Sequence, residues 1–416
     1  MVLLVSILSS IYCYLIINKF DELTDNNFNI IFKNIQFEYG KLIHNIYYNF
    51  DYSFIDDDGI IYYLKRLPLH PLLLVSIAKI SKNIFFIFIF KNIILFSLLF
   101  ISVLVALRSQ KIKVFVLFLL FLPFIIPYNL HVILSIFFAD NIVAVLMPSI
   151  FILLYSNNKK KYFLISIFIF LLYLTKNSVM FVVYILPLLI ILLEKDRLIL
   201  KSLPLFGAIS AIFLWGIFGI INTSKFPIGS SVLTSNSKVL NEVVLNEKFK
   251  EFYPERSVDL INKNQIPDHL KSEWEVYEYY KIENKIYLSK NFFEFVSDIK
   301  IKLKFIFFNI KKDSVFPING KYENPIMISH IINKIFFNLS IIIFFIFFVK
   351  NFKKNFDFRA QKNDLYFINI LLFSLFPNII GWATSKHLVS IQIISIIYIL
   401  FKFNFYNNNK FILKFN

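Results

Sequence analysis

The chain is poor in cysteine, glycine and proline, with one cysteine, 8 glycines and 13 prolines among 416 residues. The single Cys13 excludes a disulfide framework within the chain and a metal centre built from several thiolates. A glycine-rich phosphate loop, a His-Glu-x-x-His zinc motif and a serine nucleophile elbow are also missing. Any chemistry must therefore come from side chains on separate loops.

Apolar residues, in contrast, are abundant. Hydrophobic residues make up 57% of the chain and aromatic residues 19%, and the mean hydropathy is +0.66. A water-soluble domain of this length has no core large enough to bury so much apolar surface, so the composition predicts that lipid surrounds most of the chain. The net charge of +17 would indicate a nucleic-acid partner in a soluble protein. Here the basic residues lie in short loops between apolar runs, which favours membrane orientation and no nucleic-acid partner.

The apolar runs predict an all-α, multi-pass membrane protein with about ten transmembrane helices, several of them short for a crossing. The first run has no basic leader or cleavage pattern and is therefore interpreted as a helix that is retained. The predicted spans are residues 1–18, 83–107, 113–127, 140–156, 162–174, 178–193, 202–222, 328–349, 365–381 and 388–403.

Three regions follow from these spans. Residues 1–222 form an N-terminal transmembrane module with a first outer loop at 19–82, residues 223–327 form a long outer, periplasmic loop region, and residues 328–416 hold the last helices and a cytoplasmic tail. No repeat of solenoid period and no inverted repeat is found.

The loop charges predict the orientation of the spans. Basic residues occupy every second connection, as the positive-inside rule requires when both termini are cytoplasmic. These groups are Arg108, Lys111 and Lys113; Lys159, Lys160 and Lys161; Lys195, Arg197 and Lys201; Lys350, Lys353, Lys354, Arg359 and Lys362; and Lys402, Lys410 and Lys414. The loops at 19–82, 128–140, 175–177, 223–327 and 382–387 then face outward. A lysine cluster at 300–312 fits less well, but long loops obey the rule weakly.

The first outer loop has the clearest local pattern. Apolar residues from Tyr39 to Phe50 recur at the spacing of one helical face. An acidic turn at 56–59, a short strand at 60–64 and the run from Arg66 to Pro71 follow. We expect this loop to lie on the membrane and to hold acid, base and arginine at its surface. In the long outer loop, residues 272–287 predict a helix and residues 301–310 an apolar segment along the membrane.

Two carboxylates are candidates for catalysis. Glu38 lies on the polar face of the predicted helix, where it could take a proton from an acceptor hydroxyl; the alternative is a solvated surface charge. Asp140 lies between apolar segments, where an ionisable group is costly unless it faces water or a partner. Its alternative role is that of N-cap for the next helix, and both roles can hold together. Asp57 belongs to a run of acids typical of an exposed turn, and Asp21 is a reserve candidate.

Several cations also interrupt apolar sequence on the outer side: Lys176, the pair Lys386 and His387, and Arg66 with His70. Cations at a lipid surface suit a phosphate or pyrophosphate leaving group, and arginine can hold a phosphate with two hydrogen bonds. The alternative for the lysines is snorkelling to the membrane interface. No cofactor is indicated, and because no ligand cluster stands out, the need for a divalent metal stays open.

Four motifs, spread over nearly the whole chain, together carry a resemblance. They are EYGKLIHNI from Glu38 with YSFIDDDG and RLPLHPLLL after it; FFAD ending at Asp140; LTKN around Lys176; and SKHLVSIQ from Ser385. In order, spacing and shared outward face they resemble the GT-C glycosyltransferases, above all bacterial protein O-mannosyltransferase relatives and the aminoarabinose transferases that modify lipid A.

The sequence departs from the family pattern at two places. The family usually has an aspartate four residues before the tyrosine that Tyr39 matches, and this chain has Ile35 there, so Glu38 or Asp21 would have to replace it. Lys386 and His387 stand where Arg-Tyr or Arg-His is usual.

The resemblance implies a GT-C-like bundle in the bacterial cytoplasmic membrane and an inverting hexosyl or pentosyl transfer. The donor would be a polyprenyl-phosphate sugar, and the acceptor a hydroxyl of a lipid, glycan or protein at the outer face. It implies Glu38 as the base, Asp140 as a second carboxylate, and Arg66, Lys176, Lys386 and His387 as phosphate ligands, with Asp57 and His70 toward the acceptor. Two other classes compete: a transporter or flippase for lipid-linked glycans, and a glycan polymerase or ligase.

Overall fold

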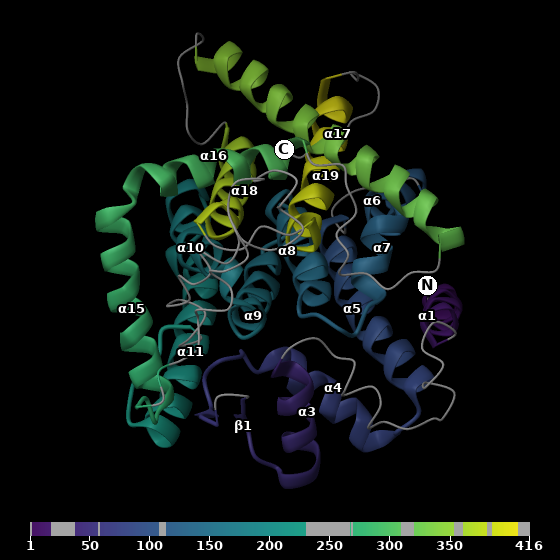
Figure 1. Ribbon diagram of the computed structural model, residues 1–416. Helices are drawn as coiled ribbons and strands as arrows, with labels where there is room; N and C mark the ends of the chain where they lie inside the picture. Colours follow the sequence, from purple (N-terminus) through teal and green to yellow (C-terminus); the bar gives the residue numbers. More distant parts are fainter. Residues whose placement is uncertain are drawn as a thin grey trace.

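The computed structural model describes residues 2–17, 38–56, 59–107, 114–229, 267, 269–308, 320–352, 361–380 and 385–406 (Figure 1). These residues are predominantly helical, as the sequence predicts. Strand within them is limited to one hairpin, in which β1 (Phe54–Ile55) pairs antiparallel with β2 (Ile61–Tyr62). The short strand predicted at 60–64 is therefore confirmed in part, at Ile61–Tyr62.

The helices follow the apolar runs closely. The N-terminal region contains α1 (Val2–Ile17), α3 (Glu38–Asn49), α4 (Leu69–Ile80), α5 (Ile84–Leu107), α6 (Val114–Ile125), α7 (Pro127–Leu134), α8 (Asp140–Leu154), α9 (Lys161–Tyr173), the 3-10 turn η2 (Asn177–Val179), α10 (Met180–Leu193) and α11 (Leu198–Thr223). After the long polar region come α15 (Glu273–Lys290), α16 (Phe292–Phe308), α17 (Gly320–Phe352), α18 (Lys362–Ile380), η4 (Ser385–Leu388) and α19 (Val389–Tyr406).

Three helices are long and apolar enough to cross a membrane: Ile84–Ala106, Leu198–Thr223 and Ile326–Lys350. Six further apolar helices are shorter. The 15 residues of α8 span only about 22 Å, less than the hydrocarbon thickness of a bilayer. In its described part the structure thus contains three helices that are both long and apolar enough to span a membrane, and the larger predicted number stays a prediction.

One predicted loop is wrong in part, because residues 128–134 of the expected loop 128–140 form most of α7. Two prolines explain the break that separates α7 from α6. Pro123 lies inside α6, and Pro127 is the first residue of α7, where its fixed φ suits a helix start. Ile126 between the helices is extended (ψ 127°), as is typical of a residue before proline.

α8 is the central helix of the molecule, and all of its residues are buried. Helices α5, α9 and α19 pack against it, and Figure 1 shows it in the middle of the bundle. A helix that is apolar on every side is stable only when other helices surround it. Its first residue, Asp140, is thereby brought to a buried position at one end of the bundle.

The first outer loop folds against that same end. Figure 1 shows α3, β1 and α4 together at the bottom of the view, and α3 packs on both α4 and β1. The predicted apolar face of α3 is buried from Tyr39 to Tyr47, but Phe50 is 81% exposed. The prediction is wrong at Phe50 because the chain leaves the helix there in a left-handed conformation (φ 57°), which turns the side chain off that face.

The helix predicted at 272–287 is confirmed as α15, and a reciprocal cap defines its start. The Ser272 amide donates to Glu275 Oε2 (3.0 Å), and the Glu275 amide donates to Ser272 Oγ (3.3 Å). The amides of Lys271 and Ser272 lower the pKa of Glu275, because they bind its charged form. The apolar segment at 301–308 lies in α16, where Lys334 of α17 donates to the Phe305 carbonyl, so one side of α16 packs on protein.

Candidate functional site

Asp140 does not cap α8, because the N-cap position belongs to Ala139 and makes no side-chain hydrogen bond. Instead the Asp140 carboxylate accepts a hydrogen bond from Lys176 Nζ at 2.5 Å. Only 7% of the Asp140 side chain and 17% of the Lys176 side chain are exposed. The capping alternative is therefore wrong, although an acid in the first turn still suits the positive end of the helix dipole.

Lys176 is held in the short connection between α9 and α10. Its backbone is extended (φ −160°, ψ 136°), and it directly precedes η2. Burial lowers the pKa of Lys176, the Asp140 charge opposes this effect, and the positive charge of Arg66 lowers the pKa further. Three charged side chains from three separate segments therefore act on one another here.

His387 adds a fourth segment to this group. Its Nε2 lies 3.9 Å from Asp140 Oδ1, and its Nδ1 lies 3.2 Å from the Asn378 side-chain oxygen. A carboxylate and an amide oxygen both favour a ring that donates hydrogen bonds. Asn378 was not selected from the sequence. The available signal was an amide side chain within an apolar run, which the structure shows as a buried residue of α18.

Arg66 and His70 reach the same place from the first outer loop. The Arg66 guanidinium lies over the Tyr39 ring at 5.1 Å, and the His70 ring meets Tyr39 edge-on at 5.2 Å. The Leu69 amide at the start of α4 donates to the Leu174 carbonyl (2.8 Å), close to Lys176 in the chain. We call Tyr39, Arg66, His70, Asp140, Lys176 and His387 the outer cluster.

Glu273 was also missed in the sequence. This buried carboxylate at the start of α15 accepts hydrogen bonds from the amides of Tyr63 (3.0 Å) and Leu64 (3.1 Å). Glu273 thus connects α15, in the long outer region, to residues that lie shortly before Arg66. The Tyr52 hydroxyl donates to the Arg66 carbonyl (2.8 Å) from the other side, and burial raises the pKa of Tyr52. The helix predicted at 272–287 indicated a helix start near Glu273, but no local pattern indicated a partner about 210 positions away.

Three predicted site residues have no described side chain. Glu38 is the first residue of α3, next to Tyr39, and Lys386 lies in η4, next to His387. Asp57 lies outside the described residues. The structure therefore brings together Arg66, His70, Asp140, Lys176 and His387 and places the backbones of Glu38 and Lys386 beside members of the outer cluster.

His70 is fully buried in the outer cluster. Burial lowers its pKa to about 3, the Lys91 charge acts in the same direction, and Asp140 and the Ile136 backbone oppose it. The imidazole is therefore neutral near pH 7 in the folded protein. It can hydrogen-bond and pack there, but it carries no charge that would hold a phosphate.

This shift predicts an acid-sensitive fold. Between pH 6.5 and about 3 the unfolded chain binds a proton at His70 and the folded chain does not, so stability falls as the pH falls through this range. The contribution is about 1.4 kcal/mol for each pH unit below 6.5. Thermal unfolding of the full chain in detergent at pH 7 and pH 5 should show a smaller loss for His70→Gln than for the wild type. Equal losses in both proteins would contradict a neutral, buried His70.

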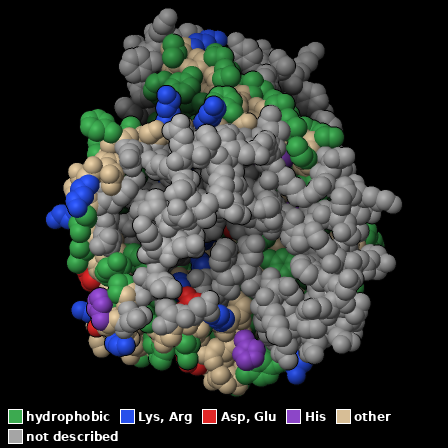
Figure 2. Space-filling model, viewed as in Figure 1, with side chains coloured by type: hydrophobic (Ala, Val, Ile, Leu, Met, Phe, Trp, Pro, Cys, Tyr) green, Lys and Arg blue, Asp and Glu red, His purple; other side chains and the backbone are tan. Residues whose placement is uncertain are grey.

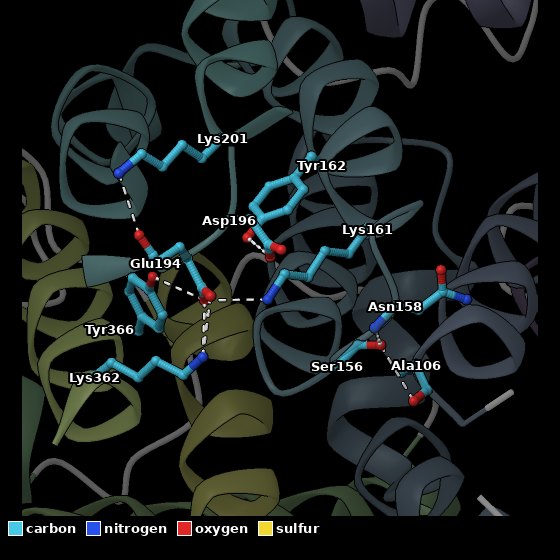
Figure 3. A network of polar contacts seen from close by, with 10 residues as sticks. All are labelled: Ala106, Ser156, Asn158, Lys161, Tyr162, Glu194, Asp196, Lys201, Lys362 and Tyr366. Atoms are coloured by element: carbon cyan, nitrogen blue, oxygen red, sulfur yellow. Dashed lines mark hydrogen bonds and ion pairs between the residues drawn. The ribbon is translucent and has the colours of Figure 1, made fainter. Parts of the chain in front are cut away.

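A second polar group, which we call the inner cluster, lies at the other end of α9. Figure 3 shows Glu194, just after the end of α10, accepting from Lys161 (3.1 Å), Lys362 (3.1 Å) and Tyr366 (3.3 Å). Tyr162 donates to Asp196 (2.7 Å) beside it. These contacts join the starts of α9 and α18 to the connection between α10 and α11.

The two clusters are separated by the length of a helix. Lys161 is the first residue of α9, and Lys176 lies shortly after the last residue of this helix. The 13 residues of α9 span about 20 Å. On the face drawn in Figure 2, the acidic side chains lie in the lower half of the view, which in Figure 1 is the side of α3 and β1. The outer and inner clusters therefore lie at opposite ends of α9.

Comparison with known proteins gives no match: no family model, curated protein or solved structure is significantly similar to the chain. Among the residues that the structure describes, no three His, Cys, Asp or Glu side chains are grouped as ligands of a metal ion. The chemistry of the outer cluster must therefore be argued from its geometry. A buried carboxylate beside a lysine, an arginine and a histidine can bind an anionic group and orient a hydroxyl next to it.

Proposed function

We propose that the chain is a membrane glycosyltransferase that moves a sugar from a polyprenyl-phosphate donor to a hydroxyl of a lipid, glycan or protein. The observation that carries the proposal is the convergence of Asp140, Lys176 and His387 with Arg66 from four separate connections. Ionisable groups that gather at one end of an apolar bundle are costly to bury and are usually functional.

In this proposal the cations hold the donor phosphate. Negative charge grows on the phosphate as its bond to the sugar breaks, and Arg66, Lys176 and His387 offer fixed positive or hydrogen-bonding groups to that charge. Arg66 can bind two phosphate oxygens at once. Lys386 joins this group because it is next to His387 in η4.

The pairing of Asp140 with Lys176 supports a defined order of events. A bound phosphate competes with Asp140 for the Lys176 ammonium, and the carboxylate is then able to accept a hydrogen bond from the acceptor hydroxyl. The acceptor oxygen attacks the anomeric carbon, the bond from that carbon to the phosphate oxygen breaks, and the hydroxyl proton passes to Glu38 or Asp140. The sugar is transferred with inversion, and the polyprenyl phosphate leaves.

The proposal includes a multi-pass topology of about ten spans in the bacterial cytoplasmic membrane, with both termini cytoplasmic. The arrangement of charges supports it. Lys159, Lys160 and Lys161 lie at the end of α9 that is opposite to Lys176, and Lys362 joins Lys161 on Glu194. A basic inner end and a mixed-charge outer end suit an active site that faces outward.

The direct test is transfer of radiolabelled sugar from a panel of polyprenyl-phosphate sugars in membranes that contain the full chain, with membranes lacking it as the control. Labelled sugar should move from the lipid carrier into an acceptor fraction only when the chain is present. Translocation of an intact lipid-linked glycan without breakage of its sugar–phosphate bond would instead identify a transporter and overturn the proposal.

A further inference from the structure

A cleft of about 830 Å³ lies on the outer side of α3, between this helix and the β1–β2 hairpin. Lys41, His44 and Asn45 line it from the exposed face of α3, and Asp51, Ser53 and Tyr63 line it from the hairpin segment. Its volume is within the range typical of ligand sites, about 300 to 1,000 Å³. The outer cluster does not include any of these six residues.

Hydrogen bonds within the protein hold the polar side chains that line the cleft. The Asn45 amide donates to the Ser53 carbonyl (2.7 Å), and Ser53 Oγ donates to Asp51 Oδ2 (2.5 Å). Within the described residues, the other Asp51 oxygen, Oδ1, forms no hydrogen bond. A carboxylate held in this way can accept a hydrogen bond from a ligand at little entropic cost.

The lining favours an uncharged ligand that is rich in hydroxyl groups. Lys41 and Asp51 give the cleft lining formal charges of opposite sign that sum to zero, so no net charge selects an anion. Carboxylate, amide and imidazole groups can pair with hydroxyls as donors or acceptors. Phe54, Ile61 and Tyr63 supply apolar and aromatic surface between them. A sugar has this combination, with hydroxyls at its edge and C–H groups on its faces.

The cleft also adjoins the outer cluster along the chain. Gly40 lines the cleft, while the preceding residue, Tyr39, contacts both Arg66 and His70 on the inner face of α3. We infer that this cleft binds a neutral oligosaccharide, and that this oligosaccharide carries the acceptor hydroxyl; the second part rests on the proposed glycosyltransferase function. The inference selects a glycan over a protein or a plain lipid as the acceptor.

The test measures retention of the purified full chain, in detergent, on an array of immobilised neutral and acidic oligosaccharides. We expect binding to neutral oligosaccharides that weakens at least tenfold in Asp51→Asn and in Tyr63→Ala. His269→Ala is the matched control, because this exposed histidine does not line the cleft. Retention on no oligosaccharide, or equal retention of both cleft variants and the wild type, would overturn the inference.

Two further arms separate this inference from the proposed function. Glycan binding by a wild type that transfers no sugar would leave the cleft assignment standing and refute the proposed function. Sugar transfer that is unaffected in both cleft variants would keep the function and refute the cleft as the acceptor site. Binding to acidic oligosaccharides alone would show an anion site and overturn the inference.

Discussion

Replacing Asp140 by asparagine is expected to reduce sugar transfer by a factor of about 10² to 10⁴, the usual contribution of a general acid or base. Asparagine has almost the same shape, but it can neither accept a proton nor balance the Lys176 charge at 2.5 Å. Because the carboxylate acts on the acceptor hydroxyl in the proposed mechanism, kcat should fall more than the donor KM rises. The measurement is transfer from radiolabelled donor in membranes of equal protein content.

The control for this variant is Glu278→Gln, an exposed carboxylate on α15 that pairs only with its helical neighbour Lys281 among the contacts described. It should transfer sugar at the wild-type rate. Glu38→Gln, tested in parallel, should also lose transfer if Glu38 is the base. Wild-type rates in both Asp140→Asn and Glu38→Gln would refute the two-carboxylate site and direct attention to Asp21 and Asp57.

Replacing Glu194 by glutamine is expected to reduce the free energy of unfolding by about 3 to 5 kcal/mol, the usual cost of removing one partner of a buried ion pair. Only 2% of the Lys161 side chain is exposed, so its ammonium would be left inside the bundle without its ion-pair partner. Lys362 and Tyr366 would lose a charged acceptor as well. Thermal unfolding of the full chain in detergent should show the loss as a lower Tm.

Two control variants test whether this loss of stability is specific to the inner cluster. Glu278→Gln breaks a surface pair and should cost at most about 0.5 kcal/mol. The double variant Glu194→Gln with Lys161→Met should be more stable than Glu194→Gln alone, because it removes the uncompensated charge. A Tm for Glu194→Gln equal to that of Glu278→Gln would show that Glu194 does not stabilise the junction of α9, α10 and α18.

The two clusters contribute differently to the protein. In the inner cluster the two lysines, Lys161 and Lys362, are matched by the two acids Glu194 and Asp196, which suits a junction that holds helices together. In the outer cluster the carboxylate of Asp140 pairs with Lys176, and the Arg66 charge acts on Lys176 as well, so two fixed cations stand against one described carboxylate and an anionic ligand would find positive charge in excess. This difference is the reason for assigning chemistry to the outer cluster and stability to the inner one.

The sequence by itself determined where the helices lie. Apolar runs became α5, α8, α9 and α10, and the 3.6-residue period of the first outer loop became α3, because both patterns describe neighbours along the chain. It also indicated the members of the site, since Asp140, Lys176 and His387 each interrupt apolar sequence where an ionisable group is costly.

Only the tertiary structure decided which of these residues meet. The contacts join residues that are 36 to 247 positions apart. They are the pair of Asp140 with Lys176, the approach of His387 to Asp140, and the hydrogen bonds from the Tyr63 and Leu64 amides to Glu273. The exposure of Phe50 and the start of α7 have local causes instead, a left-handed residue and the position of Pro127, which the apolar pattern does not report. Periodicity reports the face on which a side chain lies, but the packing of whole helices determines its partner across that face.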